Sequence, residues 1–149
     1  MPRKRQTAAP GTLFGIPRLD GQMVVGQVLE EWYVGVVCIA VFDCAIPAQE
    51  SFDPSSLSVA AVISVTSVAR AEIKKGYWKV IGSGALLVDP RLSPHRKFSA
   101  PDFIGAQWHS GGTIEKLVNA YYGLATWEPY PGRPGQLKSL LLSGETVKH

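Results

Sequence analysis

The sequence is poor in cysteine, which restricts how the fold can be stabilised. Cys38 and Cys44 are the only cysteines among its 149 residues. If the chain between them is extended, a rise of about 3.3 Å per residue holds their Cα atoms far beyond the ~6 Å that a disulfide prefers. We expect both thiols to be reduced, Cys38 as a small buried residue and Cys44 as an ordinary thiol. Because cysteine and histidine do not cluster at zinc-site spacing, we predict neither a metal nor another cofactor.

Long apolar runs are also missing. The longest, around residues 34–42 and 59–65, fall short of the ~20 residues that a membrane helix needs. No apolar run precedes Pro10, so a secretory signal is not predicted. We therefore expect a cytoplasmic protein without membrane contact.

An excess of one charge sign is absent outside the N-terminus. The formal net charge is +3, and Arg3, Lys4 and Arg5 account for all of it. The other basic residues balance the twelve acidic ones, so the folded body is predicted not to bind nucleic acid. We predict a disordered basic tail over residues 1–10, followed by a single domain over residues 11–149.

Residues 11–29 predict two short strands joined by a turn. Pro17 lacks an N–H and should end the first strand. Asp20 and Gly21 then form a strong hairpin signal, because glycine reaches positive φ without a Cβ clash. Gly26 interrupts the apolar alternation of the second strand. There we favour a bulge or tight bend over a ligand that passes close to the backbone.

The remaining chain predicts further strands and one clear helix. Strands are predicted at three ranges, 32–43, 61–66 and 77–82, and loops at 44–58, 89–102 and 129–135. Glu30 and Glu31 predict a turn before the first of these strands, which we expect to be central and covered on both faces. Gly76 should end a helical turn over residues 67–75. An edge strand is expected at 103–109.

The helix is predicted over residues 113–122. Its apolar residues recur with the period of one helix face: Ile114, Leu117, Val118, Tyr121 and Tyr122. Thr113 is the predicted N-cap, and Gly123 closes the C-terminus. A short docking helix should follow over residues 136–142. Together these elements predict an α+β fold, with a strongly bent antiparallel sheet of about five to seven strands, or a half-open SH3-like barrel, and one or two packed helices.

Three segments carry a resemblance to a known family. They are residues 13–29 (LFGIP, DG and GQVL in order), residues 76–82 (GYWKVIG), and YYGL at 121–124 with Trp127. In order and spacing, the sequence resembles the Immunity protein 26 family of bacterial polymorphic toxin systems. The resemblance implies an immunity protein that binds and neutralises a cognate toxin without being an enzyme. It transfers no individual functional residues.

A hydrolase is the alternative from another class, because some proteins grouped with this family are described as organophosphate-hydrolysing. An esterase of this kind would use Cys44, Ser110 or a histidine. Two arrangements can be imagined: Cys44 with His109 and Asp102, and Ser110 with His95 and Asp89. Spacing singles out neither of them, so we predict no catalytic residues. An SH3-like adaptor for peptides or nucleic acid is a third possibility.

Aromatic and basic residues beside predicted turns and loops are the candidates for a partner-binding surface. Trp and Tyr contribute ~2 kcal/mol or more where they fill a pocket of a partner. The candidates are Trp32, Tyr33, His95, Arg96, Trp108 and His109. Trp78 and Trp127 are instead assigned to the core or its edge. The segments 89–102 and 129–135 depart most from the family pattern, and either partner specificity or neutral variation explains them. No oligomeric state is specified.

Overall fold

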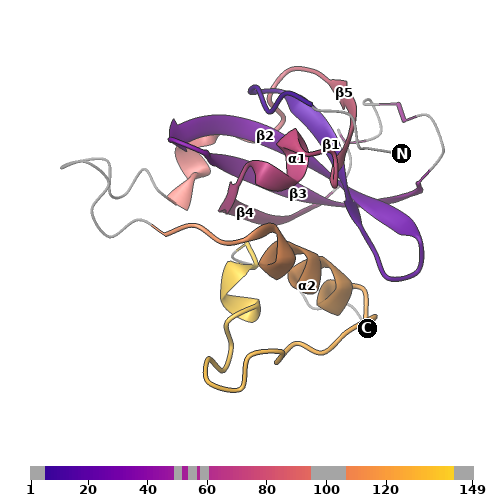
Figure 1. Cartoon of the computed structure of the whole chain (residues 1–149), viewed down its shortest axis with the longest axis vertical. Coiled ribbons are helices and arrows are strands. Elements are labelled where there is room, and N and C mark those ends of the chain that lie inside the picture. Colours follow the sequence, from indigo (N-terminus) through magenta and orange to yellow (C-terminus); the bar gives the residue numbers. More distant parts are fainter. Residues whose placement is uncertain (1–5, 49–51, 54–56, 58–60, 95–106, 143–149) are drawn as a thin grey trace.

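The protein is an α+β structure built on one antiparallel sheet (Figure 1). A computed structural model describes residues 6–48, 52–53, 57, 61–94 and 107–142. The strands are β1 (Thr12–Pro17), β2 (Gln22–Tyr33), β3 (Val36–Pro47), β4 (Val62–Ala69) and β5 (Lys79–Ser83). The helices are α1 (Ala71–Lys74) and α2 (Gly111–Tyr121), with single 3-10 turns at η2 (Pro90–Leu92) and η4 (Lys138–Leu140).

The sheet has the order β4-β3-β2-β1-β5 and is not closed. Consecutive strands are neighbours from β1 to β4, and β5 returns to the free edge of β1. All four pairings are antiparallel. The predicted α+β class and antiparallel sheet are confirmed. The predicted central strand is β3, which lies inside the sheet, although β2 occupies the middle position.

The predicted hairpin is confirmed as β1 and β2. Leu13 pairs with Gln27 and Pro17 pairs with Met23, so Pro17 ends β1 as expected. The loop closes through a hydrogen bond from the backbone N–H of Arg18 to the carbonyl of Gln22. Gly21 adopts a φ of 87°, the left-handed conformation that its place in the turn requires.

The predicted turn at Glu30 and Glu31 is wrong. β2 continues through both residues to Tyr33, and the reversal falls at Val34 and Gly35, where Gly35 has a φ of 76°. Register shifts against β3 occur after Val28 and after Glu31. These irregularities let the strand bend while it stays paired, so two adjacent acids did not end it. Trp32 consequently belongs to β2 and not to the following strand.

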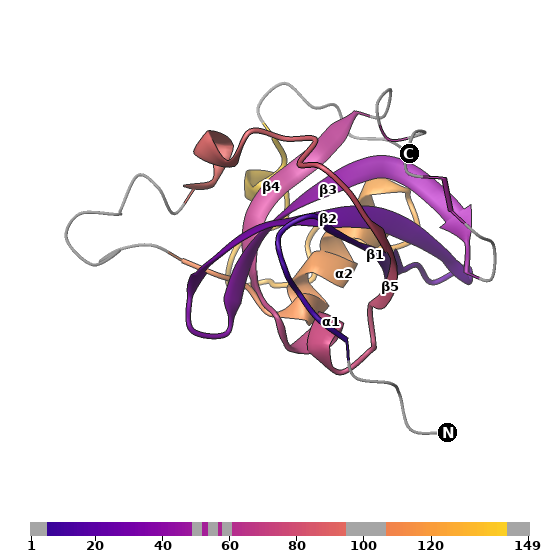
Figure 2. The ribbon, with the colours of Figure 1, turned by 90° about the horizontal axis from the view of Figure 1, so that it is seen from above.

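Both faces of the sheet carry a hydrophobic cluster. On one face α1 and α2 cover β1 to β4, and their Ile73, Ile114 and Tyr121 pack against that face (Figure 2). On the other face, Leu57 and Val88 from two loops pack over a second cluster that includes Cys38 and Phe42. The continuous apolar run of β3 is explained by this double cover. Cys38 and Cys44 are both reduced, as expected.

Helix α2 begins and ends close to its predicted positions, whereas α1 begins four residues later than predicted, because β4 continues through Ala69. Ser110, not Thr113, is the N-cap of α2, because its hydroxyl accepts a hydrogen bond from the Thr113 backbone N–H. Gly76 follows α1 with a φ of 83°, as predicted. The expected docking helix is reduced to η4, preceded by the buried Leu137.

Some residues of the predicted tail contact the folded body. Gln6 forms hydrogen bonds with α1 and β5, and Ala8 packs against the core. Residues 1–5 lie outside the described residues, as do residues 103–106 of the predicted edge strand. From that segment, His109 forms a single parallel bridge with Val68 of β4. No helix in the described part of the chain is long and apolar enough to cross a membrane.

Candidate functional site

Three of the predicted partner-binding residues lie together at one end of the sheet. Tyr33 stacks on Trp108 with ring centroids 5.9 Å apart and an interplanar angle of 25°. The Trp32 ring centroid lies 6.3 Å from that of Trp108, in an edge-on arrangement, and 6.0 Å from that of Tyr33, in a tilted arrangement. These separations lie in the range that aromatic pairs favour. We call Trp32, Tyr33 and Trp108 the aromatic cluster.

Backbone pairing brings the two halves of the aromatic cluster together. Trp32 and Tyr33 end β2, while Trp108 comes from a segment that runs beside β4. His109 donates its N–H to the carbonyl of Ser67 and accepts the N–H of Ala69, which fixes this segment against the sheet. The Trp32 indole N–H donates to the Ser67 hydroxyl at 2.9 Å. The cluster is therefore held by the sheet and not by loop packing alone.

Much of the aromatic cluster remains exposed. Tyr33 is 53% exposed and Trp108 is 49% exposed, and the adjacent Val34 at the hairpin tip is 86% exposed. Tyr33 and Trp108 each leave about half of their area in contact with solvent, although their rings are stacked on one another. Exposed Trp and Tyr are residue types that are enriched in protein interfaces.

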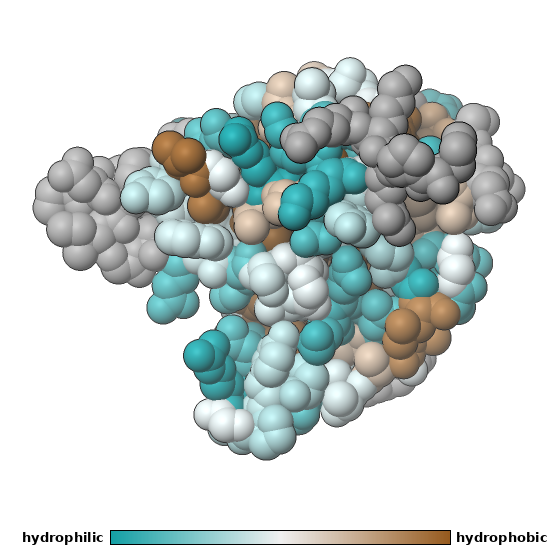
Figure 3. Space-filling model, in the orientation of Figure 1, coloured by the Kyte–Doolittle hydropathy of each residue, from teal (hydrophilic) through white to brown (hydrophobic). Residues whose placement is uncertain are grey.

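A cleft opens beside Trp108. It has a volume of about 630 Å³ and lies between the start of α2 and the C-terminal loop. Its lining residues are Trp108, His109, Ser110, Thr113, Pro129, Tyr130, Pro131, Gly132, Arg133 and Gln136. In Figure 3 the surface is indented between the sheet layer and this loop. Trp108 belongs to both the cluster and the cleft, so the two features form one continuous surface.

The loop that forms the far wall of the cleft is closed by its own hydrogen bonds. The Glu128 carboxylate accepts the Gly135 N–H at 2.9 and 3.2 Å, and the Arg133 N–H donates to the Tyr130 carbonyl at 2.8 Å. The hydroxyl groups of Tyr130 and Thr113 lie 3.2 Å apart and tie the loop to α2. We call residues 128–136 the clasped loop.

The other predicted partner-binding residues are His109, His95 and Arg96. His109 is half-buried in the cleft, and burial lowers the pKa of its imidazole, so the side chain is neutral at pH 7. His95 and Arg96 lie outside the described residues. The sequence-based prediction missed Arg133 and Tyr130 as individual residues. The sequence signal there is a pair of Pro-Gly dipeptides, at 131–132 and 134–135, which predicts the loop at 129–135 but not the surface that it faces.

The Cys44 hydrolase arrangement is not assembled. His109 lies beside Val68, which pairs with Val37, and Cys44 is seven positions farther along β3. At ~3.3 Å per residue, roughly 20 Å of strand separates the two groups. Asp102 falls outside the described residues.

Ser110 and Asp89, from the second arrangement, are engaged elsewhere. The Ser110 hydroxyl caps α2, and the Asp89 carboxylate accepts hydrogen bonds from the backbone and side chain of Arg91. His95 is not among the residues described. No group of three His, Cys, Asp or Glu side chains able to hold a metal ion occurs in the described ranges.

Comparison of the chain with protein-family models, curated proteins and solved structures gives no match.

Proposed function

We propose that this protein is an immunity protein, which binds a cognate bacterial toxin domain and neutralises it by covering it. The observation that carries the proposal is the stacked pair of Tyr33 and Trp108, half-exposed and fixed to the sheet. A rigid aromatic surface of this kind loses little side-chain entropy on binding, and it therefore favours tight association. The sequence resemblance to immunity proteins supports a toxin as the partner.

The segments that carry the resemblance meet in one hydrophobic cluster. Phe14 of β1 stacks on Trp78 with ring centroids 5.5 Å apart and an interplanar angle of 9°. Tyr121 of α2 belongs to the same buried cluster, and Trp127 packs at its edge. These residues therefore stabilise the fold and do not form a binding surface. This supports an immunity-type framework whose contact surface differs from one protein to the next.

The half-open SH3-like barrel belongs to the same proposal. Three register shifts between β2 and β3, together with another between β3 and β4, support a strongly bent sheet. The β2–β3 hairpin tip and the cleft lie at the same end of the molecule, because Trp108 stacks on Tyr33 and also lines the cleft. A toxin domain would then contact a protruding aromatic edge beside a hollow.

Growth protection tests the proposal. The secreted-toxin domain encoded beside this gene would be expressed in bacteria with and without this protein. We expect the wild-type protein to restore growth, and the double substitution Tyr33→Ala with Trp108→Ala to weaken the complex by at least a hundredfold, from two hot spots of ~2 kcal/mol each. Tyr77→Ala is the matched control, because Tyr77 is 49% exposed and lies at the opposite end of the sheet.

Two outcomes would overturn the proposal. One is the absence of a toxin gene whose product this protein binds. The other is turnover of ester or organophosphate substrates by the purified wild-type protein, with or without added divalent metals, and its loss on substitution of His109 or Ser110. That result would instead support the hydrolase.

A further inference from the structure

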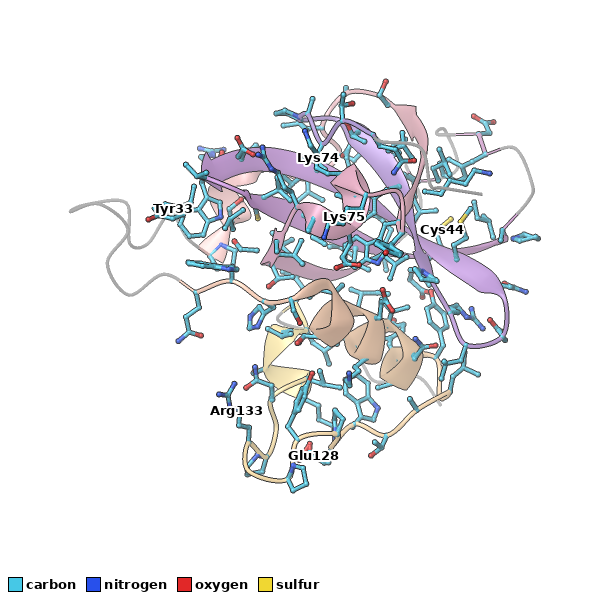
Figure 4. The ribbon with its side chains drawn as sticks, in the orientation of Figure 1. Tyr33, Cys44, Lys74, Lys75, Glu128 and Arg133 are labelled. Carbon is cyan, nitrogen blue, oxygen red and sulfur yellow. The ribbon has the colours of Figure 1, made fainter. Side chains whose placement is uncertain are left out.

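Arg133 differs from the other arginines in the described part of the chain. Arg18, Arg70 and Arg91 each form an ion pair with a carboxylate, at 2.6, 2.6 and 2.7 Å. Arg133 pairs with none of the described carboxylates. It extends from the clasped loop into the wall of the cleft, and Figure 4 shows Arg133 and Tyr33 at the same side of the molecule.

An unpaired arginine on a mobile surface segment would be an ordinary solvated charge. Arg133 instead lies in a loop restrained from several sides. Pro131 and Pro134 restrict the backbone around it, Glu128 closes the loop at Gly135, and Arg133 donates its own N–H to Tyr130. The restrained backbone fixes the position from which this exposed side chain extends, and the planar guanidinium matches a carboxylate in a bidentate pair.

None of the described residues that line the cleft is negatively charged. Arg133 is the only charged one among them, and His109 there is neutral at pH 7. Lys116 adds positive charge nearby, with its ammonium 5.8 Å from the Tyr130 ring centroid. The carboxylate of Glu128 is engaged by the Gly135 N–H. The cleft therefore favours an anionic occupant.

Rings form part of the cleft lining, beside the polar side chains of Ser110, Thr113 and Gln136. Trp108 presents a half-exposed indole, and Pro129, Tyr130 and Pro131 line the facing side. Rings and pyrrolidines of this kind pack well against proline or aromatic side chains. The cleft thus offers one position for a carboxylate and an adjacent one for a ring.

We propose that the cleft receives a segment of a partner protein in which an aspartate or glutamate lies next to a proline or aromatic residue. Arg133 binds the carboxylate, and the ring lies on Trp108, continuous with the aromatic cluster. The inference rests on the proposed function for the identity of the partner as the toxin. A nucleic acid fits less well, because its affinity depends on several phosphate contacts and the described residues that line the cleft carry a single cation.

Selection from a peptide library tests the inference without the toxin. A phage-displayed library of random dodecapeptides would be selected on the wild-type protein, and enriched peptides would be synthesised with a fluorophore. We expect Asp or Glu adjacent to Pro, Trp, Tyr or Phe. Affinity should fall by roughly tenfold or more in Arg133→Gln and in Trp108→Ala, as for a hot spot. Arg133→Lys should recover only part of it, because the bidentate geometry is lost.

Matched controls separate the cleft from general charge attraction. Arg91→Gln removes an exposed arginine outside the cleft and should leave peptide affinity unchanged. Glu128→Ala should weaken binding through loosening of the clasped loop, which makes Glu128 a positioning residue. Circular dichroism of each variant shows whether the fold is retained.

Several results would overturn the inference: no enriched peptide, enrichment without acidic residues, or equal affinity for Arg133→Gln and wild type. Preferential binding of a single-stranded oligonucleotide through Arg133 would do the same. The outcome is separable from that of the proposed function. Toxin protection that needs Tyr33 but not Arg133 keeps the immunity role and removes this inference, whereas acidic peptide binding without any toxin does the reverse.

Discussion

The phenol of Tyr122 donates a 2.6 Å hydrogen bond to the carboxylate of Asp43. This bond joins the C-terminal end of α2 to β3, across 79 positions of sequence. The Arg18 guanidinium lies 4.4 Å from the centroid of the Tyr122 ring and pairs with Asp20 at 2.6 Å. The hairpin loop, the helix and the sheet therefore meet at one polar contact. Burial, and then the hydrogen bond to Asp43 and its charge, raise the pKa of Tyr122.

Alkaline pH should destabilise the protein through Tyr122. A tyrosine of the unfolded chain loses its proton near pH 10, whereas folded Tyr122 keeps it to higher pH. The stabilisation is therefore complete below pH ~10 and declines above it, by about 1.4 kcal/mol per pH unit. Urea unfolding at pH 8 to 11 should show a weaker pH dependence for Tyr122→Phe than for wild type. Tyr77→Phe is the control. An equal decrease in the pH dependence of stability in both variants would contradict the role of Tyr122.

Gln27 should contribute strongly to stability despite its polar side chain. It is completely buried, donates to the Ala85 carbonyl at 2.9 Å and accepts the Leu87 N–H at 3.0 Å. Gln27→Leu leaves these two backbone groups without partners and should lower the free energy of unfolding by about 2 to 6 kcal/mol, at 1–3 kcal/mol per group. Chemical denaturation measures the change. Gln22→Leu, exposed on the same strand, should change it little, and similar losses for both would refute the explanation.

Gly26 should not tolerate a side chain. A Cβ at this position would lie 2.6 Å from the Phe14 ring, which the stack with Trp78 holds in place. Gly26→Ala should therefore lower the melting temperature, with a loss of about 1–3 kcal/mol from overpacking. Gly84→Ala introduces a Cβ into open space and serves as the control. A Gly26→Ala protein as stable as Gly84→Ala would show that the Phe14 ring moves aside freely.

Gln6 should anchor the chain ahead of β1. Its amide donates to the carbonyls of Ile73 and Trp78 at 2.7 and 2.8 Å and accepts the Val80 N–H at 2.8 Å. Gln6→Ala should lower the free energy of unfolding by about 1–3 kcal/mol, because these part-buried backbone groups lose their partner. Hydrogen exchange should show faster exchange at the Val80 amide. Thr7→Ala is the adjacent exposed control, and unchanged exchange in Gln6→Ala would contradict this role.

Local chemistry explains which elements were predictable. The β1–β2 hairpin follows from Pro17 and from the Asp20-Gly21 pair, whose conformational preferences act within a few residues. Helix α2 follows from a single apolar face. The turn misplaced at Glu30 and Glu31 shows the opposite case. Two acids favour solvent, but Glu31 is exposed and Glu30 is partly exposed while the backbone of β2 stays paired with β3. Glu31 also forms an ion pair with Arg70 at 2.6 Å.

The sequence by itself determined the α+β class, the hairpin, the main helix and the aromatic candidates, because periodicity and turn chemistry are local properties. It did not determine that Trp108 would stack on Tyr33, 75 positions away, or that the clasped loop would place Arg133 in the same cleft. Those relationships depend on the order of strands in the sheet and on the bonds of His109 to β4. Tertiary structure decided them, because contacts between distant segments exist only once the backbone pairs are formed.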